Sequence, residues 1–356
     1  MSARDEFNTL APEFSVKVNG APMPNDAVAD VHALTVLDDV DAPGMFTLTL
    51  SAWDSVEMKA KWIDDNLFRE GNPVEVGLGY QDRTSTLISG EITAIEPVFA
   101  MSREPLLTLR GHDRRHRLMR ARRTRSFTQS KDSDIASRLA TEAGLRPDVE
   151  DTGVTLPYVL QHNQTDLEFL MTRARRIGYE LIVRDKVLLF RSRAAAAGPE
   201  LTLRREIELL EIRPRLSTLG QVPEVEVLGW NPADKAAITG RARVGDESRR
   251  MEGKQSGPVA VQAAFDPGKS KRVAQPVHSQ AEADQLARRG FAEMALNYVH
   301  AEGLCIGDPR MKAGTVVKIE GLGERFSGPY YLSSVEHRFD RRNGYRTAFH
   351  AMRNAA

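Results

Sequence analysis

The chain has 356 residues, and its 49 Lys and Arg residues balance 49 Asp and Glu residues, so the formal charge is zero. This length predicts two or three domains whose cores fold without disulfides, and the neutral charge disfavours bulk binding to nucleic acid or acidic membranes. The single cysteine, Cys305, excludes an intrachain disulfide, multi-cysteine zinc sites and Cys-x-x-Cys redox motifs, and it indicates a reducing compartment. The N-terminus has no apolar stretch and no window approaches ~18 uncharged apolar residues, so neither a signal peptide nor a membrane span is expected.

The first third of the chain alternates apolar and polar residues, which predicts half-buried strands. Turn residues such as Asn19-Gly20 and Gly71-Asn72-Pro73 separate the alternating segments. Many short strands at this spacing are typical of an antiparallel barrel or sandwich, and we assign residues 1–113 to a first β-barrel. The expected strands are Phe14–Val18, Val31–Leu37, Phe46–Leu50, Val74–Tyr80, Leu87–Ile95 and Leu106–Arg110.

The periodicity then becomes helical. Residues 131–144 combine an Asp/Ser start with a terminal glycine, and a second helix begins at Thr165, where Glu168 completes a capping box, and ends at Gly178. A hairpin formed by Tyr179–Val183 and Val187–Arg191 follows. We therefore predict an α/β insertion domain over residues 114–195, with Ala194–Pro199 as a connector.

Strands return after the connector. Leu201–Leu203, Ile207–Ile212 and Val225–Trp230 precede a polar stretch at Asp246–Arg272, which we interpret as a long loop. Ser279 and Glu282 form a capping box that opens the longest predicted helix, and three strands follow at Val316–Ile319, Tyr330–Val335 and Tyr345–Phe349. We assign 196–245 and 305–356 to a second β-barrel, with the polar loop and long helix of 246–304 inserted in it.

The two strand-rich ends share a weak internal repeat. Ile95-Glu96-Pro-Val-Phe99, followed by Leu109, is matched about 240 positions later by Val335-Glu336-His-Arg-Phe339, followed by Phe349. Alternating strands share such patterns by chance, but the match favours a duplicated unit. The fold class expected is mainly β, with two similar antiparallel β-barrels and an α/β insertion domain.

Eight arginines lie between Arg110 and Arg125, opposed only by Asp113. Arginine suits bidentate phosphate contact, so the cluster is a candidate nucleic-acid site. No aromatic residue alternates with these arginines to stack on bases, and no helix-turn-helix spacing surrounds them. We therefore expect the arginine cluster to be solvated or to face another subunit, at a subunit interface or in a lumen. The residues assigned to it are Arg114, Arg115, Arg117, Arg120, Arg122 and Arg123.

Catalytic and metal motifs are weak. His112 and His116 are four residues apart, but the segment lacks the glutamate of a zinc-protease helix and lies among cations. The sequence contains no Gly-x-Ser-x-Gly elbow, no Walker loop and no dinucleotide fingerprint after a strand. Glu96 and Glu336 are better explained as surface acids than as glycosidase carboxylates. We expect no cofactor, no metal and no catalysis.

Several segments, in order, resemble one family. They include Tyr158–Thr165 followed by Asp166, Phe169 and Gly178, the Leu109–Asp113 strand end, and the segment from Val225 through Trp230 to Pro232. The closing segment runs from Gly314 through Gly321, Gly328, Tyr330 and His337 to Arg353. Together they resemble the baseplate hub of contractile phage tails, the late control protein D family, which is similar to the N-terminal half of the secretion spike protein VgrG.

That resemblance implies a structural role without catalysis. The family fold has two similar barrels with an α/β insert, and a trimer of such chains joins a six-fold inner tube to a three-fold spike. The implied partners are further copies of the chain, an inner-tube or tube-adaptor protein, baseplate wedge proteins, and DNA or cargo passing through the lumen. The implied location is the cytoplasm during assembly and then a phage tail or injection particle.

One departure from the family concerns the C-terminus. In VgrG and in fused phage hubs, further spike domains follow the second barrel, whereas this sequence continues for three residues after Arg353. We therefore expect the spike to be a separate polypeptide. The alternatives are a nucleic-acid-binding protein that uses Arg110–Arg125 and a carbohydrate-active enzyme in the α/β insert.

Overall fold

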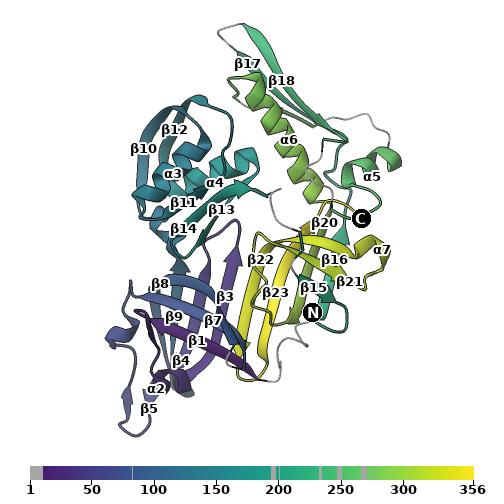
Figure 1. Cartoon of the computed structure of the whole chain (residues 1–356). Coiled ribbons are helices and arrows are strands. Elements are labelled where there is room, and N and C mark those ends of the chain that lie inside the picture. The colour runs from purple at the N-terminus through teal and green to yellow at the C-terminus, as the bar shows by residue number, and fades with distance from the viewer. Residues whose placement is uncertain are drawn as a thin grey trace.

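The computed structural model describes residues 11–356 except 82, 194–197, 200, 232–234, 247–250, 266–270 and 275. The fold is mainly β: one 13-stranded sheet spans both ends of the chain, and two smaller units pack beside it (Figure 1). Most of the predicted connector, parts of the predicted polar loop, and Pro232 lie outside the described residues.

The N-terminal half of the large sheet surrounds its own apolar core. Its six main strands lie in the order β1-β7-β8-β9-β4-β3, and their buried side chains form one cluster with Met23, Phe68 and neighbouring residues. β3 and β4 bury residues at alternate positions, so one face of the sheet covers the core. The elements are β1 (Pro12–Val18), β2 (Ala21–Pro22), α2 (Asn25–Asp30), β3 (Val31–Asp39), β4 (Met45–Ser51), β5 (Trp53–Asp54), β6 (Lys59–Ala60), η1 (Asn66–Phe68), β7 (Pro73–Tyr80), β8 (Arg83–Ala100) and β9 (Arg103–Asp113).

The C-terminal half also surrounds its own core. Its strands lie in the order β15-β21-β22-β23-β20-β16, and a second apolar cluster that includes Leu203, Tyr330 and Phe349 fills the interior. The elements are β15 (Leu201–Arg204), β16 (Leu209–Leu216), β20 (Val299–Ile306), β21 (Val316–Glu320), α7 (Gly323–Phe326), β22 (Gly328–Asp340) and β23 (Gly344–Arg353).

The two halves have the same strand order, which confirms the predicted duplication. In chain order, β1, β3, β4, β7, β8 and β9 correspond to β15, β16, β20, β21, β22 and β23, and the spatial orders then coincide. They differ in one pairing, because β1 pairs with β7 antiparallel whereas β15 pairs with β21 parallel. Each half is therefore an open six-stranded barrel with its own core.

Pairing registers support the same correspondence. Ile95 pairs with Leu109, and Val335 pairs with Phe349, so both partners shift by 240 positions (335 minus 95 and 349 minus 109). A β-bulge interrupts β8 between Ile92 and Ala94, and another interrupts β22 between Leu332 and Ser334, again 240 positions apart. A bulge bends its strand and fixes its register, so the two barrels share this distortion as well as their order. β8 has a further bulge between Val98 and Ala100 that β22 lacks.

One antiparallel ladder joins the barrels into a single sheet. β3 lies at the end of the first barrel's spatial order. It pairs with the second part of β22, from Ser334↔Asp39 to Asp340↔Ala33. The first part of β22 pairs with β21 instead. Tyr80 of β7 adds a side-chain contact across the junction, because its hydroxyl donates to the Gly307 carbonyl at 3.0 Å and its ring centroid lies 5.6 Å from that of Tyr345.

The α/β insertion domain packs beside the first barrel (Figure 1). Its core contains Phe127 and Phe169, whose rings stack with centroids 5.8 Å apart. The hydroxyl of Tyr331 in β22 donates to the buried carboxylate of Glu180, which ties the insert to the second barrel. Its elements are η2 (Arg114–Met119), β10 (Arg122–Ser130), α3 (Asp132–Glu142), β11 (Arg146–Val149), β12 (Leu156–Thr165), α4 (Asp166–Ile177), β13 (Tyr179–Arg184) and β14 (Val187–Ser192).

A second insertion separates β16 from β20, and here two sequence predictions need correction. The strand predicted at Val225–Trp230 does not belong to the second barrel: β17 pairs with β18 and β19 in a separate three-stranded sheet. That sheet packs on α6 around its own apolar cluster, which includes Val227 and Phe291. The predicted loop at 246–272 also contains a helix, α5. The elements are β17 (Glu224–Asn231), β18 (Ala236–Arg243), α5 (Gly257–Ala264), β19 (Lys271–Ala274) and α6 (Gln280–Leu296).

Candidate assembly surface

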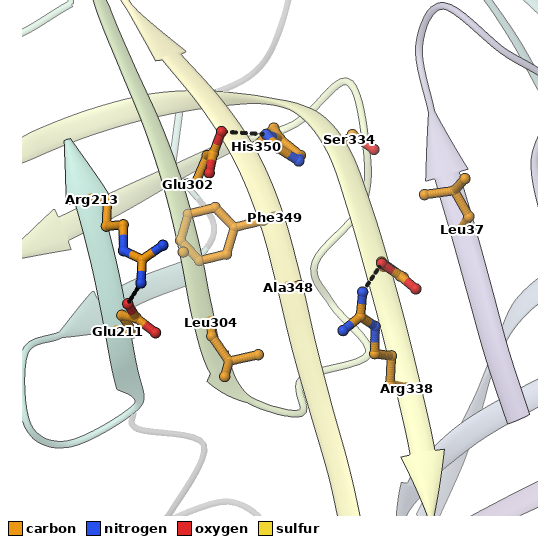
Figure 2. A pocket seen from close by; sticks show the side chains of 12 residues that line it. Leu37, Glu211, Arg213, Glu302, Leu304, Ser334, Arg338, Ala348, Phe349 and His350 are labelled. Atoms are coloured by element: carbon orange, nitrogen blue, oxygen red, sulfur yellow. Dashed lines mark hydrogen bonds and ion pairs between the residues drawn. The ribbon is translucent and has the colours of Figure 1, made fainter. Parts of the chain in front are cut away.

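The face of the large sheet that points away from the two cores runs across the barrel junction. At that junction β3, β22, β23, β20 and β16 together form a shallow hollow of about 260 Å³ (Figure 2). Because side chains alternate along a strand, this face carries every second residue of each strand. The hollow is lined by Leu37, Glu211, Arg213, Glu302, Gly303, Leu304, Ser334, Glu336, Arg338, Ala348, Phe349 and His350.

The charged side chains of the hollow pair locally. Arg213 contacts Glu211 at 2.6 Å, Arg338 contacts Glu336 at 2.5 Å, and His350 lies 3.8 Å from Glu302 (Figure 2). Two of the pairs join residues two apart on one strand. Exposed pairs of this kind contribute about 0–1 kcal/mol each. The arrangement gives a mixed-charge polar surface, and it brings no acid, base and nucleophile together around one point.

The arginine cluster mostly serves the chain's own structure, which corrects the predicted placement of two members. Arg115 is 1% exposed, and its Nη2 lies 2.7 Å from the Asp113 carboxylate. The Nη1 group of Arg115 donates to the carbonyls of Asp39 at 3.0 Å and Leu181 at 3.3 Å. Arg115 thus ties the ends of β9 and β3 to the middle of β13. Arg114 is also buried and contacts Asp185, so neither side chain is available to a lumen or a subunit interface.

Glu91 of β8 contacts the next two residues of this segment, His116 and Arg117. His116 Nε2 lies 2.8 Å from the Glu91 carboxylate, and Arg117 Nε donates to it at 3.0 Å. Burial by itself raises the pKa of Glu91, but the hydrogen bonds from Arg117 and His116 outweigh burial and lower that pKa overall. His112 contacts the Thr93 hydroxyl at 2.8 Å instead of turning toward His116.

The remaining arginines face acids that are distant in sequence. Arg122 contacts Glu168 at 2.9 Å, and Arg123 lies 3.8 Å from both Glu142 and Asp166. Arg120 contacts the ring of His116 at 3.4 Å. Arg122 and Arg123 are about half exposed, so they stay candidates for an interface or lumen. The sequence could not reveal their carboxylate partners, which lie up to 46 positions away (168 minus 122).

The family-motif residues of the insert cap and fill α4. Asp166 accepts from Arg125 at 2.6 Å and from Gln161 at 2.8 Å, and Phe169 is buried against Phe127. Gly178 ends the helix with φ +74°, in the left-handed region that glycine adopts at low cost. These residues therefore support the fold of the insert.

The family-motif residues of the second barrel are also structural in their contacts. Gly321 occupies a turn with φ +87°, and a Cβ at Gly328 would lie 2.6 Å from the Arg353 guanidinium. The guanidinium of Arg353 lies over the ring of the buried Tyr330, at 5.5 Å from its centroid. These contacts fix the closing hairpins of the barrel.

His337 and Trp230 have opposite environments. His337 is buried, its Nε2 lies 3.1 Å from the Met311 carbonyl, and its Nδ1 lies 2.8 Å from the Tyr345 hydroxyl. Burial lowers the pKa of His337 to about 4, so the ring is neutral near pH 7. Trp230 is 58% exposed near the end of β17, so it does not pack in a core.

The described residues show neither a group of metal ligands nor a helix that could span a membrane. No group of three or more His, Cys, Asp and Glu side chains is placed to hold a metal ion within the ranges that the structure describes. Among the same residues, none of the helices has the length and apolar character needed to cross a bilayer.

Solved structures with the same fold include two tail proteins and a secretion-system component. The 43 kDa tail protein of prophage MuSo2 from Shewanella oneidensis matches with a TM-score of 0.70 at 14% identity, over 97% of this chain and 99% of that chain. The tail protein from Neisseria meningitidis MC58 matches with a TM-score of 0.70 at 14% identity, over 97% of each chain. A component of the type VI secretion system of E. coli matches with a TM-score of 0.60 at 14% identity, over 95% of this chain and 76% of that chain.

Sequence comparisons add a family. Comparison with curated proteins finds no match. The family model described as the Alg8 N-terminal domain matches residues 8–340, which is most of the chain. That description names a domain and states no activity. The chain therefore belongs to the family of the Alg8 N-terminal domain, and it has the fold of these phage-tail and secretion-system proteins.

Proposed function

We propose that this protein is the structural hub of a contractile tail or a related injection machine. In this role three copies form a ring that joins a six-fold inner tube to a three-fold spike. We also propose that the chain is related to the late control protein D family and to the hub half of VgrG. The sequence motifs between Tyr158 and Arg353 support this relationship. The tail-protein fold supports it.

The observation that carries the proposal is the repeated strand order of the two barrels, with bulges at matching positions. A joint between six-fold and three-fold partners must present both symmetries. Three chains that each contain two equivalent barrels offer six similar surfaces to a tube. The two inserted units occur only once in each chain. They therefore repeat three times around the ring and can match a three-fold spike.

A mechanical role agrees with the chemistry of the site. The charges in the junction hollow form exposed local pairs, and the buried Arg115, Glu91 and Glu180 hold elements of the chain together. The proposed hub transmits axial force through its continuous sheet when the sheath contracts. The polar outer face of that sheet is the proposed wall of a passage for DNA or cargo.

The proposed partners follow from this role. They are further copies of the chain, an inner-tube or tube-adaptor protein, a separate spike protein and baseplate wedge proteins. The proposed location is the cytoplasm during assembly and a phage tail or injection particle afterwards.

Light scattering on the purified chain over a wide range of protein concentration tests the proposal. We expect a mass of about 119 kDa, three times the 39.6 kDa of one chain, to accumulate as concentration rises, by mass action. A chain that stays monomeric at every concentration, or that forms stable dimers, contradicts the proposed ring.

A further inference from the structure

Among the strand edges of the large sheet that lack a ladder in the described residues, one belongs to β8 and one to β16. β7 pairs with β8 only as far as Glu91, so residues Ala94–Ala100 of β8 have β9 on one side and no ladder on the other. At the end of the sheet, β16 pairs with β20 on one side only. Open edges of this kind are templates for pairing with another chain.

The internal duplication gives each open edge a paired counterpart. Residues 94–100 of β8 correspond to residues 334–340 of β22, which pair with β3. β16 corresponds to β3. A bulge in each strand leaves one residue without a partner in its ladder, His32 in β3 and Leu210 in β16, and these residues are 178 positions apart (210 minus 32). Both partners of the β3–β22 junction thus have an equivalent elsewhere in the chain. In the part of the chain that the structure describes, each equivalent has no ladder on the edge that the junction uses.

Side-chain exposure agrees with a missing neighbour. Phe339 in β22 is 8% exposed, because it lies opposite Leu34 of β3 and its ring centroid is 5.2 Å from that of Phe14. Its counterpart Phe99 in β8 is 64% exposed. Leu34 is buried, whereas its counterpart Ile212 in β16 is half-buried. A large apolar side chain at an open edge, buried in the equivalent junction, indicates a surface that another copy covers.

We infer that β16 of one copy pairs antiparallel with residues Ala94–Ala100 of β8 in the next copy. This inference rests on the proposed ring of three chains, and it names the interface that closes the ring. The contact is head-to-tail, since two different edges of the chain meet, and such contacts generate closed rings when the rotation between copies allows it. The β3–β22 junction within a chain and the β16–β8 junction between chains then alternate around the ring.

The β3–β22 register specifies the residues that meet. Leu37 lies opposite Glu336 and Leu34 lies opposite Phe339. Each residue of β3 corresponds to the residue of β16 numbered 178 higher, and each residue of β22 corresponds to the residue of β8 numbered 240 lower. In the equivalent register Arg215 therefore lies opposite Glu96, and Ile212 lies opposite Phe99. An opposite-charge pair and an apolar pair directly across from each other each stabilise antiparallel strands by about 0.2–1 kcal/mol.

The same register places Pro97 opposite Pro214. Neither residue has an N–H, so this rung supplies no hydrogen bond, and both prolines suit strands whose edge is open in the isolated chain. Prolines on an edge also weaken pairing with unrelated strands. The interface therefore depends on side chains at the flanking rungs, and we expect it to form as copies are brought together at high concentration.

Disulfide trapping in the full chain tests the register. Cysteines directly opposite in an antiparallel pair have Cα atoms about 4.5–5.5 Å apart, which suits a disulfide. Within one chain six strands separate β16 from β8, and the two strands lie in different barrels (Figure 1). A disulfide in the Glu96→Cys, Arg215→Cys variant must therefore join two copies. The native Cys305 is fully buried and stays out of the reaction.

The matched control uses the equivalent rung inside the chain. Glu336→Cys with Leu37→Cys occupies the β22–β3 rung that corresponds to Glu96 and Arg215, so oxidation should give a monomer with one internal disulfide. Under the same conditions the Glu96→Cys, Arg215→Cys variant should give covalent dimers and trimers on a non-reducing gel, with no species above the trimer. A ladder that extends beyond the trimer overturns a closed ring of three.

The outcomes separate this inference from the proposed function. Trimers in light scattering, with an oxidised control but no disulfide between Glu96→Cys and Arg215→Cys, overturn the register and leave the hub proposal standing. Monomers at every concentration, with no intermolecular disulfide, overturn both.

A second pair of variants avoids cysteine chemistry. Phe99→Asp should lower the trimer fraction at least tenfold, because a carboxylate replaces the apolar contact with Ile212. Val56→Asp changes another apolar side chain, which is 91% exposed between β5 and β6, and it should leave the trimer fraction unchanged. Equal trimer fractions in the two variants contradict the interface.

Discussion

Thr93 and Ser333 make the same hydrogen bond in the two barrels. Each lies at a bulge, and its hydroxyl donates to the carbonyl of a residue on the neighbouring strand: Thr93 to Arg110 at 3.4 Å and Ser333 to His350 at 3.2 Å. Donors and acceptors are both 240 positions apart (333 minus 93 and 350 minus 110). A repeated hydroxyl at a repeated bulge indicates that each bulge is a built feature of its barrel.

The two hydroxyls should make independent contributions to stability. Ser333→Ala should lower the free energy of unfolding by about 0.5–1.5 kcal/mol, the usual value of one such hydrogen bond. Thr93→Val should lower it by more, because the Thr93 hydroxyl also contacts His112 Nδ1 at 2.8 Å. The two effects should add in the double variant, because the sites lie in different barrels and share no partner. Urea denaturation measures all three values, and a strongly non-additive double variant would contradict independent bulges.

The buried arginine should matter far more than its exposed neighbours. Arg115→Met removes the cation that pairs with Asp113 and leaves that buried carboxylate without its charge partner. The expected loss of stability is about 3–5 kcal/mol. The control, Arg123→Met, removes a half-exposed side chain that lies 3.8 Å from its acids, and it should cost about 0–1 kcal/mol. Comparable losses in the two variants would refute the structural role of Arg115.

Gly328 should tolerate no side chain. Its φ is +134°, and a Cβ would lie 2.6 Å from the guanidinium of Arg353, which donates to the Ser327 carbonyl at 2.6 Å. Gly328→Ala should therefore lower the melting temperature clearly more than Gly20→Ala, where φ is +79° and no atom lies within 4 Å of the added Cβ. In the control only the backbone preference costs energy, about 1 kcal/mol. Equal shifts in melting temperature would mean that Arg353 moves aside freely.

His337 should make stability depend on pH. Burial lowers the pKa of His337 from 6.5 to about 4, so the unfolded chain binds this proton at a higher pH than the folded chain does. The stabilisation is complete above pH 6.5 and is lost as pH falls toward 4, by about 3 kcal/mol at ~1.4 kcal/mol per pKa unit. The His337→Gln variant should lack this slope. Denaturation curves for both proteins between pH 7 and 4 measure the difference, and parallel slopes would exclude His337 as the cause.

The arginine cluster should not bind nucleic acid strongly. Carboxylates or a histidine contact Arg114, Arg115, Arg117, Arg120 and Arg122 within the chain, so few cations remain to displace counterions from phosphates. Filter binding of double-stranded DNA across a salt series should show no steep loss of affinity with salt. Tight binding at low salt that disappears in an Arg122→Ala, Arg123→Ala variant would restore the nucleic-acid alternative.

Local signals in the sequence identified much of the fold. The capping box of Thr165 and Glu168 is present, with hydrogen bonds of 2.9 and 3.1 Å, and Gly178 ends that helix. These features depend on residues close together in the chain, where propensity and capping decide the structure. The repeat at about 240 positions was visible as well, because the same strand register requires the same apolar spacing.

Long-range pairing was not predictable in the same way. The alternation in Val225–Trp230 indicates a strand but does not specify its neighbours, so β17 was wrongly assigned to the second barrel. The arginine cluster looked uncompensated for the same reason, because Glu91, Asp185 and Glu168 reach it only through the tertiary fold. The open edges of β8 and β16 also become apparent only once the pairing of each strand in the sheet is known.

The most direct test of the central claim is electron microscopy of the assembled ring viewed along its axis, combined with its mass. We predict six barrel-sized lobes at nearly equal spacing from a particle whose mass corresponds to three chains. A ring with six chains, or three chains whose two barrels occupy unlike positions around the axis, would contradict the account.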